Sequence, residues 1–343
     1  MRSRRVRIGA VLATAGLLLA ACGGSAKLSS TKSGSTSLTN LSVALALDPP
    51  KMIFIDLYVA KYEGFFARNG LNVTLEPELG GIQSARAVAA GNAYFDAGGT
   101  DAVASSAESG SGLTGVFNYG KDDLSLISQG SITSVSQLRG KTIAIGNSTG
   151  PAYQLSAIAL EAAHIPLSAV HFVILAGGRP ELISALVSGR AAASAFHIDD
   201  GLTALQDDHS LHILEPMYKD APNYWYSTVA APRKFVNAHP ATVERFVLAM
   251  LETNRWMYTH KAQVVSIGVK YTGEPQSIVS KSYDFLATNH LWPENVGVTP
   301  AQILYTEHVF LSSHTLKTIA PPSKVFDFRF IDEALKKLGR VSG

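Results

Sequence analysis

Glycine-rich segments directly before helix-forming sequence are the parts of this chain best suited to bind a ligand. Each would leave unpaired backbone N–H groups at a helix N-terminus, where the helix dipole attracts an anion. In open α/β sheets, ligands bind in the crevice beyond the carboxyl ends of the strands, where such segments lie. We therefore expect contacts to a small polar or anionic ligand at Gly80-Gly81, Gly98-Gly99-Thr100, Gly146 to Gly150 and Gly177-Gly178.

The most distinctive junction reads Gly146-Asn147-Ser148-Thr149-Gly150-Pro151. Ser148 or Thr149 could cap the following helix, and Pro151 suits its first turn, so a purely structural role stays open beside ligand binding. The segment also fits the G-x-S-x-G pattern of α/β-hydrolases, which would make Ser148 a nucleophile. No His-Gly-Gly-type segment for an oxyanion hole precedes it, so a serine hydrolase is the less favoured alternative.

Helix ends alone supply too little free energy for tight binding. Each contributes at most about 2 kcal/mol, so four ends give about 8 kcal/mol, equal to micromolar affinity before association costs are subtracted. Aromatic and charged side chains must contribute, and the candidates are Phe54, Tyr58, Arg179, Phe196, His197, Asp199, Trp225 and Tyr226.

Trp225 and Tyr226 lie where the chain is expected to cross between two lobes, a place from which a ring can stack on a planar ligand. We expect Trp225→Ala to weaken binding at least tenfold, about 1.4 kcal/mol.

Cofactor and metal chemistry is not expected. Cys22 is the only cysteine, which excludes an intramolecular disulfide and a zinc–thiolate cluster. His209 and His212 resemble a metal-binding pair, but no further ligand follows at a familiar spacing. We therefore predict neither a metal site nor a cofactor.

Two series of alternating strand and helix sequence must position these residues. Periodic apolar patterns predict strands at 41–47, 71–75, 94–97, 113–117 and 124–128, then at 141–145, 170–175, 191–196 and 226–230. Helices are predicted between them, for example at 151–163, and the C-terminal third is mostly helical, including 242–258 and 330–338. This alternation indicates an α/β fold in which each lobe holds a mainly parallel sheet flanked by helices. We expect residues 41–130 and 224–343 to form the first lobe and 131–223 the second.

The first 40 residues are predicted to precede the folded body. Four arginines and an apolar run from Ile8 to Ala21 are typical of a signal peptide, residues 1–21. Leu19-Ala20-Ala21-Cys22 resembles the lipobox of bacterial lipoproteins, which implies lipidation of Cys22 and an anchor on the extracytoplasmic side of the cell membrane. Residues 22–40 are rich in Ser, Thr and Gly and suit a flexible tether.

Length and composition favour a body of two lobes. About 300 residues, twice an ordinary domain, follow the tether, and 46% of the chain is hydrophobic. The net charge is near −2 once the four leader arginines are removed, which argues against a nucleic-acid partner. We expect a monomer that binds a small molecule.

The stretch from Tyr58 to Val73, YVAKYEGFFARNGLNV, resembles the A-x-x-x-G-[FY]-F-x-x-x-G-L-x-V opening of substrate-binding proteins of ABC transporters. The group in question binds nitrate, sulfonates, taurine and thiamine-pyrimidine precursors. Gly91 to Asp96, SVSQLRGK at 134–141 and Leu186 to Ala191 resemble further family segments in the same order, although Ala192 stands where the family often has Asp.

The resemblance implies a type 2 periplasmic-binding-protein fold, with two lobes joined by two hinge crossovers and closing on a solute. It implies delivery of that solute to an ABC permease and its ATPase subunits. Combined with the junctions above, it gives as ligand-binding residues Pro50, Phe54, Gly80, Gly81, Ser84, Thr100, Ser148, Thr149, Gly150, Gly178, Arg179, His197, Asp199, Trp225 and Tyr226.

The solute and its use stay open at this point. A sulfonate or nitrate would rely on helix ends and Arg179, whereas a pyrimidine-like ring would need an aromatic wall, which we favour slightly. Related enzymes of thiamine-pyrimidine synthesis carry a cysteine-rich iron motif that this chain lacks. A sensory lipoprotein that binds solute without transport fits the sequence equally well.

Overall fold

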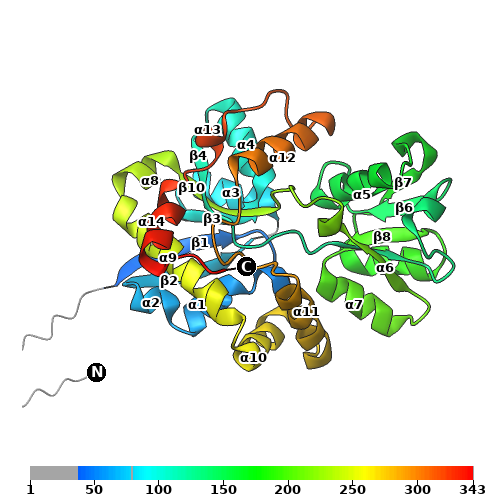
Figure 1. The fold of residues 1–343 in the computed structure, drawn as a ribbon, viewed down its shortest axis with the longest axis horizontal. Coiled ribbons are helices and arrows are strands. Elements are labelled where there is room, and N and C mark those ends of the chain that lie inside the picture. Colours follow the sequence, from blue (N-terminus) through cyan, green and yellow to red (C-terminus); the bar gives the residue numbers. More distant parts are fainter. Residues whose placement is uncertain (1–37, 79, 343) are drawn as a thin grey trace, which may run out of the picture. The chain divides into compact units, whose positions relative to one another are not determined.

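The computed structural model describes residues 38–78 and 80–342, which form two lobes, each built on a five-stranded sheet (Figure 1). The first sheet has the order β2-β1-β3-β10-β4 and the second β7-β6-β8-β5-β9. The strands are β1 (Thr39–Leu45), β2 (Leu71–Pro77), β3 (Phe95–Gly99), β4 (Leu113–Phe117), β5 (Ser125–Ser128), β6 (Thr142–Ile145), β7 (His171–Ile174), β8 (Ala193–Phe196), β9 (His212–Pro216) and β10 (Ser227–Pro232). The predicted two-lobed α/β fold is confirmed.

Both sheets are mixed. In the first, β1 pairs in parallel with β2 and β3, while β10 pairs antiparallel with β3 and β4. The second repeats this arrangement, with β5 as the reversed strand between β8 and β9. The reversed strand in each lobe is the one that the chain enters on crossing from the other lobe.

Two crossovers join the lobes, one at residues 118–124 and one between β9 and β10. The expected lobe boundary at residue 130 needs correction, because β5 pairs with β8 and β9 in the second sheet. The sequence gives no sign of this, since a short connection between two apolar strands also suits neighbours in one sheet. The body also begins earlier than expected, because β1 starts at Thr39, inside the predicted tether.

Helices cover both sheets, and several of them begin with a recognisable signal. α9 and α12 start with proline at the first helical position, and Thr299 and Gln302 form a capping box before α12. The helices of the first lobe are α1 (Asp56–Tyr62), α2 (Phe65–Arg68), α3 (Gly81–Ala89), α4 (Thr100–Ser109), α8 (Arg233–Ala238), α9 (Pro240–Met257), α10 (Lys261–Thr272), α11 (Gln276–Thr288), α12 (Pro300–Ser312), α13 (Pro322–Val325) and α14 (Arg329–Leu338). The second lobe has α5 (Pro151–Ala162), α6 (Gly178–Val187) and α7 (Ile198–Asp207).

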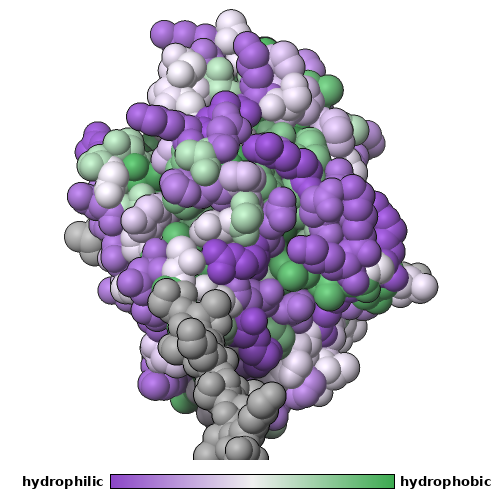
Figure 2. Space-filling view, turned by 90° about the vertical axis from the view of Figure 1, so that its left-hand side faces the viewer, coloured by the Kyte–Doolittle hydropathy of each residue, from purple (hydrophilic) through white to green (hydrophobic). Residues whose placement is uncertain are grey.

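The signal peptide, Cys22 and most of the predicted tether lie outside the described residues. Within residues 38–78 and 80–342, no helix is both long and apolar enough to cross a membrane. Figure 2 shows one face of the molecule, on which hydrophilic side chains predominate and apolar ones form small scattered patches.

Candidate functional site

A cleft of about 670 Å³ lies between the lobes and is lined by both of them. Strand ends and helix starts of the first lobe form one wall, and the equivalent ends of the second lobe form the other, as expected for a ligand site in an α/β fold. Nine of the fifteen predicted site residues line it: Pro50, Phe54, Gly80, Gly81, Thr149, Gly150, Arg179, His197 and Tyr226.

Aromatic rings gather where the crossovers pass between the lobes. Phe54 lies 5.0 Å from the ring of Tyr119 and 6.1 Å from that of Tyr226, nearly parallel to the latter. The imidazole of His197 meets Phe54 edge-on at 5.8 Å. Tyr119 and Tyr226 are buried, so half-buried Phe54 is the ring best placed to contact a ligand.

The carboxylate of Asp123 favours the protonated form of His197. Its Nδ1 lies 2.8 Å from Oδ1 of Asp123, which is fully buried and also accepts the backbone N–H of Ile198. Burial alone would lower the pKa of His197, but the charge and hydrogen bond of Asp123 raise it to about 8. Nε2 lies 3.5 Å from the hydroxyl of Tyr226, a distance too long for a strong hydrogen bond, so it can donate to a ligand.

The His197–Asp123 pair predicts a pH dependence of stability. Because folding raises the pKa of His197 from 6.5 to about 8, the pair contributes stability that is fully present below pH 6.5 and is lost as the pH rises through 8. We expect wild type and His197→Gln to differ in unfolding free energy by about 2 kcal/mol more at pH 6 than at pH 9. Urea unfolding at both pH values measures this, and an equal difference at both would contradict it.

Arg179 reaches the cleft from α6 and is held by two carboxylates. Its Nη1 donates to Oδ1 of Asp200 at 2.7 Å and to Oε1 of Glu274. Nζ of Lys51 donates to the same oxygen of Asp200, also at 2.7 Å. Partial burial disfavours the charged guanidinium, but the hydrogen bonds to Glu274 and Asp200 outweigh it and raise the pKa of Arg179.

The helix ends facing the cleft differ in what they can offer a ligand. Gly80 precedes α3 with a φ of 130°, which L-residues rarely adopt, and no side chain of the described residues caps that helix. Before α5, the backbone N–H groups of Thr149 and Gly150 donate to Oδ1 of Asn147, so neither Ser148 nor Thr149 acts as the cap. At α6, the N–H of Gly177 donates to Glu181. The N-terminus of α3 is therefore the most open anion site.

Five further predicted residues lie beside the cleft and do not line it. Ser84 is buried and donates to the carbonyl of Gly81, and Thr100 is buried and donates to that of Trp225. Asp199 is buried and accepts the N–H of Met52. Ser148 is exposed in its loop, and Gly178 takes a positive φ of 70° at the start of α6. In these cases a neighbouring residue lines the cleft, whereas the predicted residue itself does not.

Trp225 is placed differently from the prediction. Only 2% of its surface is exposed, and its ring packs edge-on against Phe326 at 5.9 Å, beside Val103 and Val298. The expectation that Trp225 forms an aromatic wall needs correction, because successive residues of an extended chain face opposite sides. Tyr226, next in sequence, faces the cleft instead.

Sequence reasoning missed several residues of the site. Tyr119 lies in the first crossover and lines the cleft. Lys51 directly follows the cleft-lining Pro50, and Asp200 directly follows the predicted Asp199. A signal was available for Asp200, since acidic residues are common in the first turn of a helix. None was available for Glu274, which lies 95 residues from Arg179.

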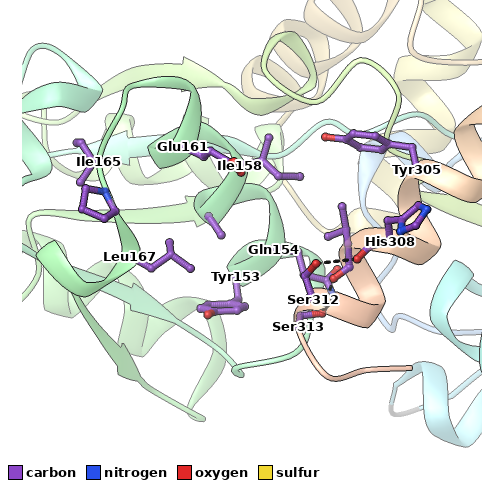
Figure 3. A pocket seen from close by; sticks show the side chains of 13 residues that line it. Tyr153, Gln154, Ile158, Glu161, Ile165, Leu167, Tyr305, His308, Ser312 and Ser313 are labelled. Carbon is purple, nitrogen blue, oxygen red and sulfur yellow. Dashed lines mark hydrogen bonds between the residues drawn. The ribbon is translucent and has the colours of Figure 1, made fainter. Parts of the chain in front are cut away.

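A second hollow of about 510 Å³ lies between α5 and α12 and contains none of the predicted site residues (Figure 3). Gln154 borders it and joins the lobes. Its Nε2 donates to the carbonyl of Thr149 at 2.8 Å and to Oγ of Ser313 at 3.1 Å, and its Oε1 accepts the hydroxyl of Tyr224. Gln154 thus connects the cleft loop to α12 and to the second crossover.

Comparison with known proteins finds a family and a set of similar structures. The sequence model of the family described as NMT1/THI5 like matches residues 52–264, more than half of the chain. No curated protein matches the sequence. The periplasmic aliphatic sulphonate binding protein SsuA from Escherichia coli is 16% identical with a TM-score of 0.70, covering 84% of this chain and 92% of that chain.

Two other similar structures are a binding protein and an enzyme. The ligand-binding component of an ABC-type import system from Staphylococcus aureus is 12% identical with a TM-score of 0.70, covering 86% of this chain and 99% of that one. A mutant of the desulfurization enzyme DszB, in complex with biphenyl-2-sulfinic acid, is 16% identical with a TM-score of 0.65, covering 87% of this chain and 99% of that one. At these identities the likeness shows a shared fold, which serves both binding and catalysis.

Proposed function

Because this chain belongs to the NMT1/THI5-like family, we propose that it is the extracytoplasmic solute-binding component of an ABC importer. The observation that carries the proposal is the cleft of about 670 Å³ between the lobes, lined by rings, cations and an uncapped helix end. The solute-binding proteins among the similar structures support it. Delivery to a permease with its ATPase, and anchoring through a lipid on Cys22, are parts of the same proposal.

The balance of charge in the cleft favours a planar solute with one anionic or hydrogen-bond-accepting group. Arg179 and His197 already face Asp200, Glu274 and Asp123, so little net positive charge is left for a small inorganic anion. The N-terminus of α3 and Nε2 of His197 can receive one acceptor group. Phe54 would cover the planar part, as in a pyrimidine or an organic sulfonate.

Phe54 gives this proposal a direct test. Phe54→Ala is expected to lower the affinity for a planar solute at least tenfold, about 1.4 kcal/mol, because it removes the half-buried ring that lines the cleft. Isothermal titration calorimetry measures the change, and Phe54→Leu, which keeps apolar volume, is the control for stacking. Unchanged affinity in Phe54→Ala would remove this ring from the site.

The solute itself is identified with the full-length protein. Native mass spectrometry detects a co-purified molecule, and a thermal-shift panel compares nitrate, taurine, alkanesulfonates, arylsulfonates and pyrimidines. A solute at 100 times its dissociation constant stabilises the fold by about 2.7 kcal/mol. The absence of any stabilising solute, together with turnover of a tested compound, would contradict a binding protein.

Sensing without transport is the second candidate function, because the same cleft would serve it. Co-purification with a permease, and solute uptake that is lost on deletion, support transport, whereas intact uptake supports sensing. A serine hydrolase is disfavoured, since Ser148 is exposed and hydrogen bonds to no histidine among the described residues. Labelling of Ser148 by a fluorophosphonate probe, lost in Ser148→Ala, would reverse that judgement.

A further inference from the structure

The lobes are joined by charged contacts along the side of the cleft where α11 lies beside α7 (Figure 1). Asp200 on α7 accepts from Lys51 of the first lobe, and Asp199 accepts the backbone N–H of Met52 at 3.1 Å. Glu274 of the first lobe accepts from Arg179 and, at 2.9 Å, from Oγ1 of Thr203. The crossing contacts therefore converge on α7 and on Arg179.

Glu274 is the residue on which two of these contacts depend. It lies between α10 and α11, which pack into the core of the first lobe, and both of its carboxylate oxygens point to residues of the second. Its side chain is only 9% exposed, and its N–H donates to Oγ1 of Thr272, which fixes the backbone. A carboxylate held this firmly loses little entropy when it binds a guanidinium.

Glu274 lies outside the part of the chain that the family model matches. The family match ends at residue 264, ten residues before it. Arg179, its partner, lines the cleft and uses only Nη1 for its hydrogen bonds within the described residues. The remaining N–H groups of Arg179 can thus serve a ligand while Nη1 bridges the lobes.

We propose that Glu274 is a positioning residue that fixes the guanidinium of Arg179 between the two lobes and so holds the lobes closed over the cleft. This inference rests on the proposed solute-binding function in one respect, since closing the lobes would serve to capture the solute. Opening the cleft must break the Arg179–Glu274 pair, which leaves a carboxylate without its partner. The strength of this pair therefore sets the fraction of closed molecules before any solute arrives.

The distance between the lobes tests the proposal without a solute. Spin labels are placed at A89C on α3 and S184C on α6, both exposed, in a chain with Cys22 replaced by serine, and the distance distribution is measured by pulsed electron resonance. Glu274→Gln is expected to lower the ratio of closed to open molecules about tenfold, because the amide keeps the shape but loses the charge. Glu274→Asp, which keeps the charge, should restore part of the closed population.

Matched variants separate positioning from a general loss of structure. Asp284→Asn breaks the exposed Lys261–Asp284 pair within the first lobe and should leave the distribution unchanged. Thr203→Val removes one hydroxyl, keeps every charge, and should shift the distribution in the same direction as Glu274→Gln by a smaller amount.

The proposal is overturned if Glu274→Gln folds with the wild-type distribution, or if Asp284→Asn opens the lobes equally. Should Glu274→Gln not fold, an unchanged Thr203→Val distribution overturns it. Since no solute is used, this result is independent of whether a panel compound binds.

Discussion

Trp225→Ala is expected to lower the free energy of unfolding by about 3–5 kcal/mol, because a buried ring is removed from a packed core. The indole packs edge-on against Phe326, in a buried cluster that also contains Val103 and Val298. The backbone of Trp225 is itself fixed by Thr306 and Thr100, so the neighbouring chain cannot readily collapse inward. Urea unfolding followed by circular dichroism measures the loss.

The same variant distinguishes a core residue from a ligand contact. Under conditions where both variants stay folded, the solute affinity of Trp225→Ala should match the wild type, whereas Phe54→Ala should bind more weakly. Trp225→Phe, which keeps most of the apolar volume, is the matched control. Weaker binding by Trp225→Ala at unchanged stability would return Trp225 to the site.

Asp96→Asn is expected to stabilise the protein at alkaline pH, by up to about 4 kcal/mol. Asp96 lies on β3, 1% exposed, and neither carboxylate oxygen has a hydrogen-bond partner at normal distance among the described residues. Burial raises its pKa from 3.8 to about 7, and the hydroxyl of Ser84 offsets only part of this. The folded state therefore binds this proton more tightly than the unfolded state does.

The sign of the pH effect follows from that difference. Between pH 3.8 and about 7, the unfolded chain ionises Asp96 first, so the contribution of this group to stability falls as the pH rises. An asparagine cannot ionise, so the variant should lack this decline and gain most over wild type at pH 8. Urea unfolding at pH 5 and pH 8 measures both. An advantage of the same size at both pH values would show that ionisation of Asp96 is not the cause.

Local patterns predicted the elements well, because each strand and helix leaves a periodic apolar signal in its own residues. The strand at 113–117 has the predicted bounds, and the helix predicted at 151–163 is observed as Pro151–Ala162. The lobe of β5 was not predictable in this way, since pairing partners depend on contacts between distant segments. The same limit applies to β9, whose half-buried residues show no clear alternation.

The site was predictable at the level of segments and less so at the level of side chains. The glycine-rich junctions mark where backbone N–H groups meet the cleft, and Gly80, Gly81 and Gly150 lie there. Which of Trp225 and Tyr226 faces the cleft depends on how the crossover enters β10 at Ser227, which the sequence pattern does not determine. Glu274 reaches Arg179 only through the packing of α10 and α11, so no local spacing indicates it.

The reversed strands have a consequence for how the two lobes fold as the chain is made. The second sheet uses only residues 125–216, so a continuous segment suffices to complete it. The first sheet keeps a gap between β3 and β4 until β10, residues 227–232, has crossed back and filled it. Contacts between segments so far apart form slowly. The second lobe should therefore fold first, while the first sheet stays incomplete until β10 joins β3 to β4.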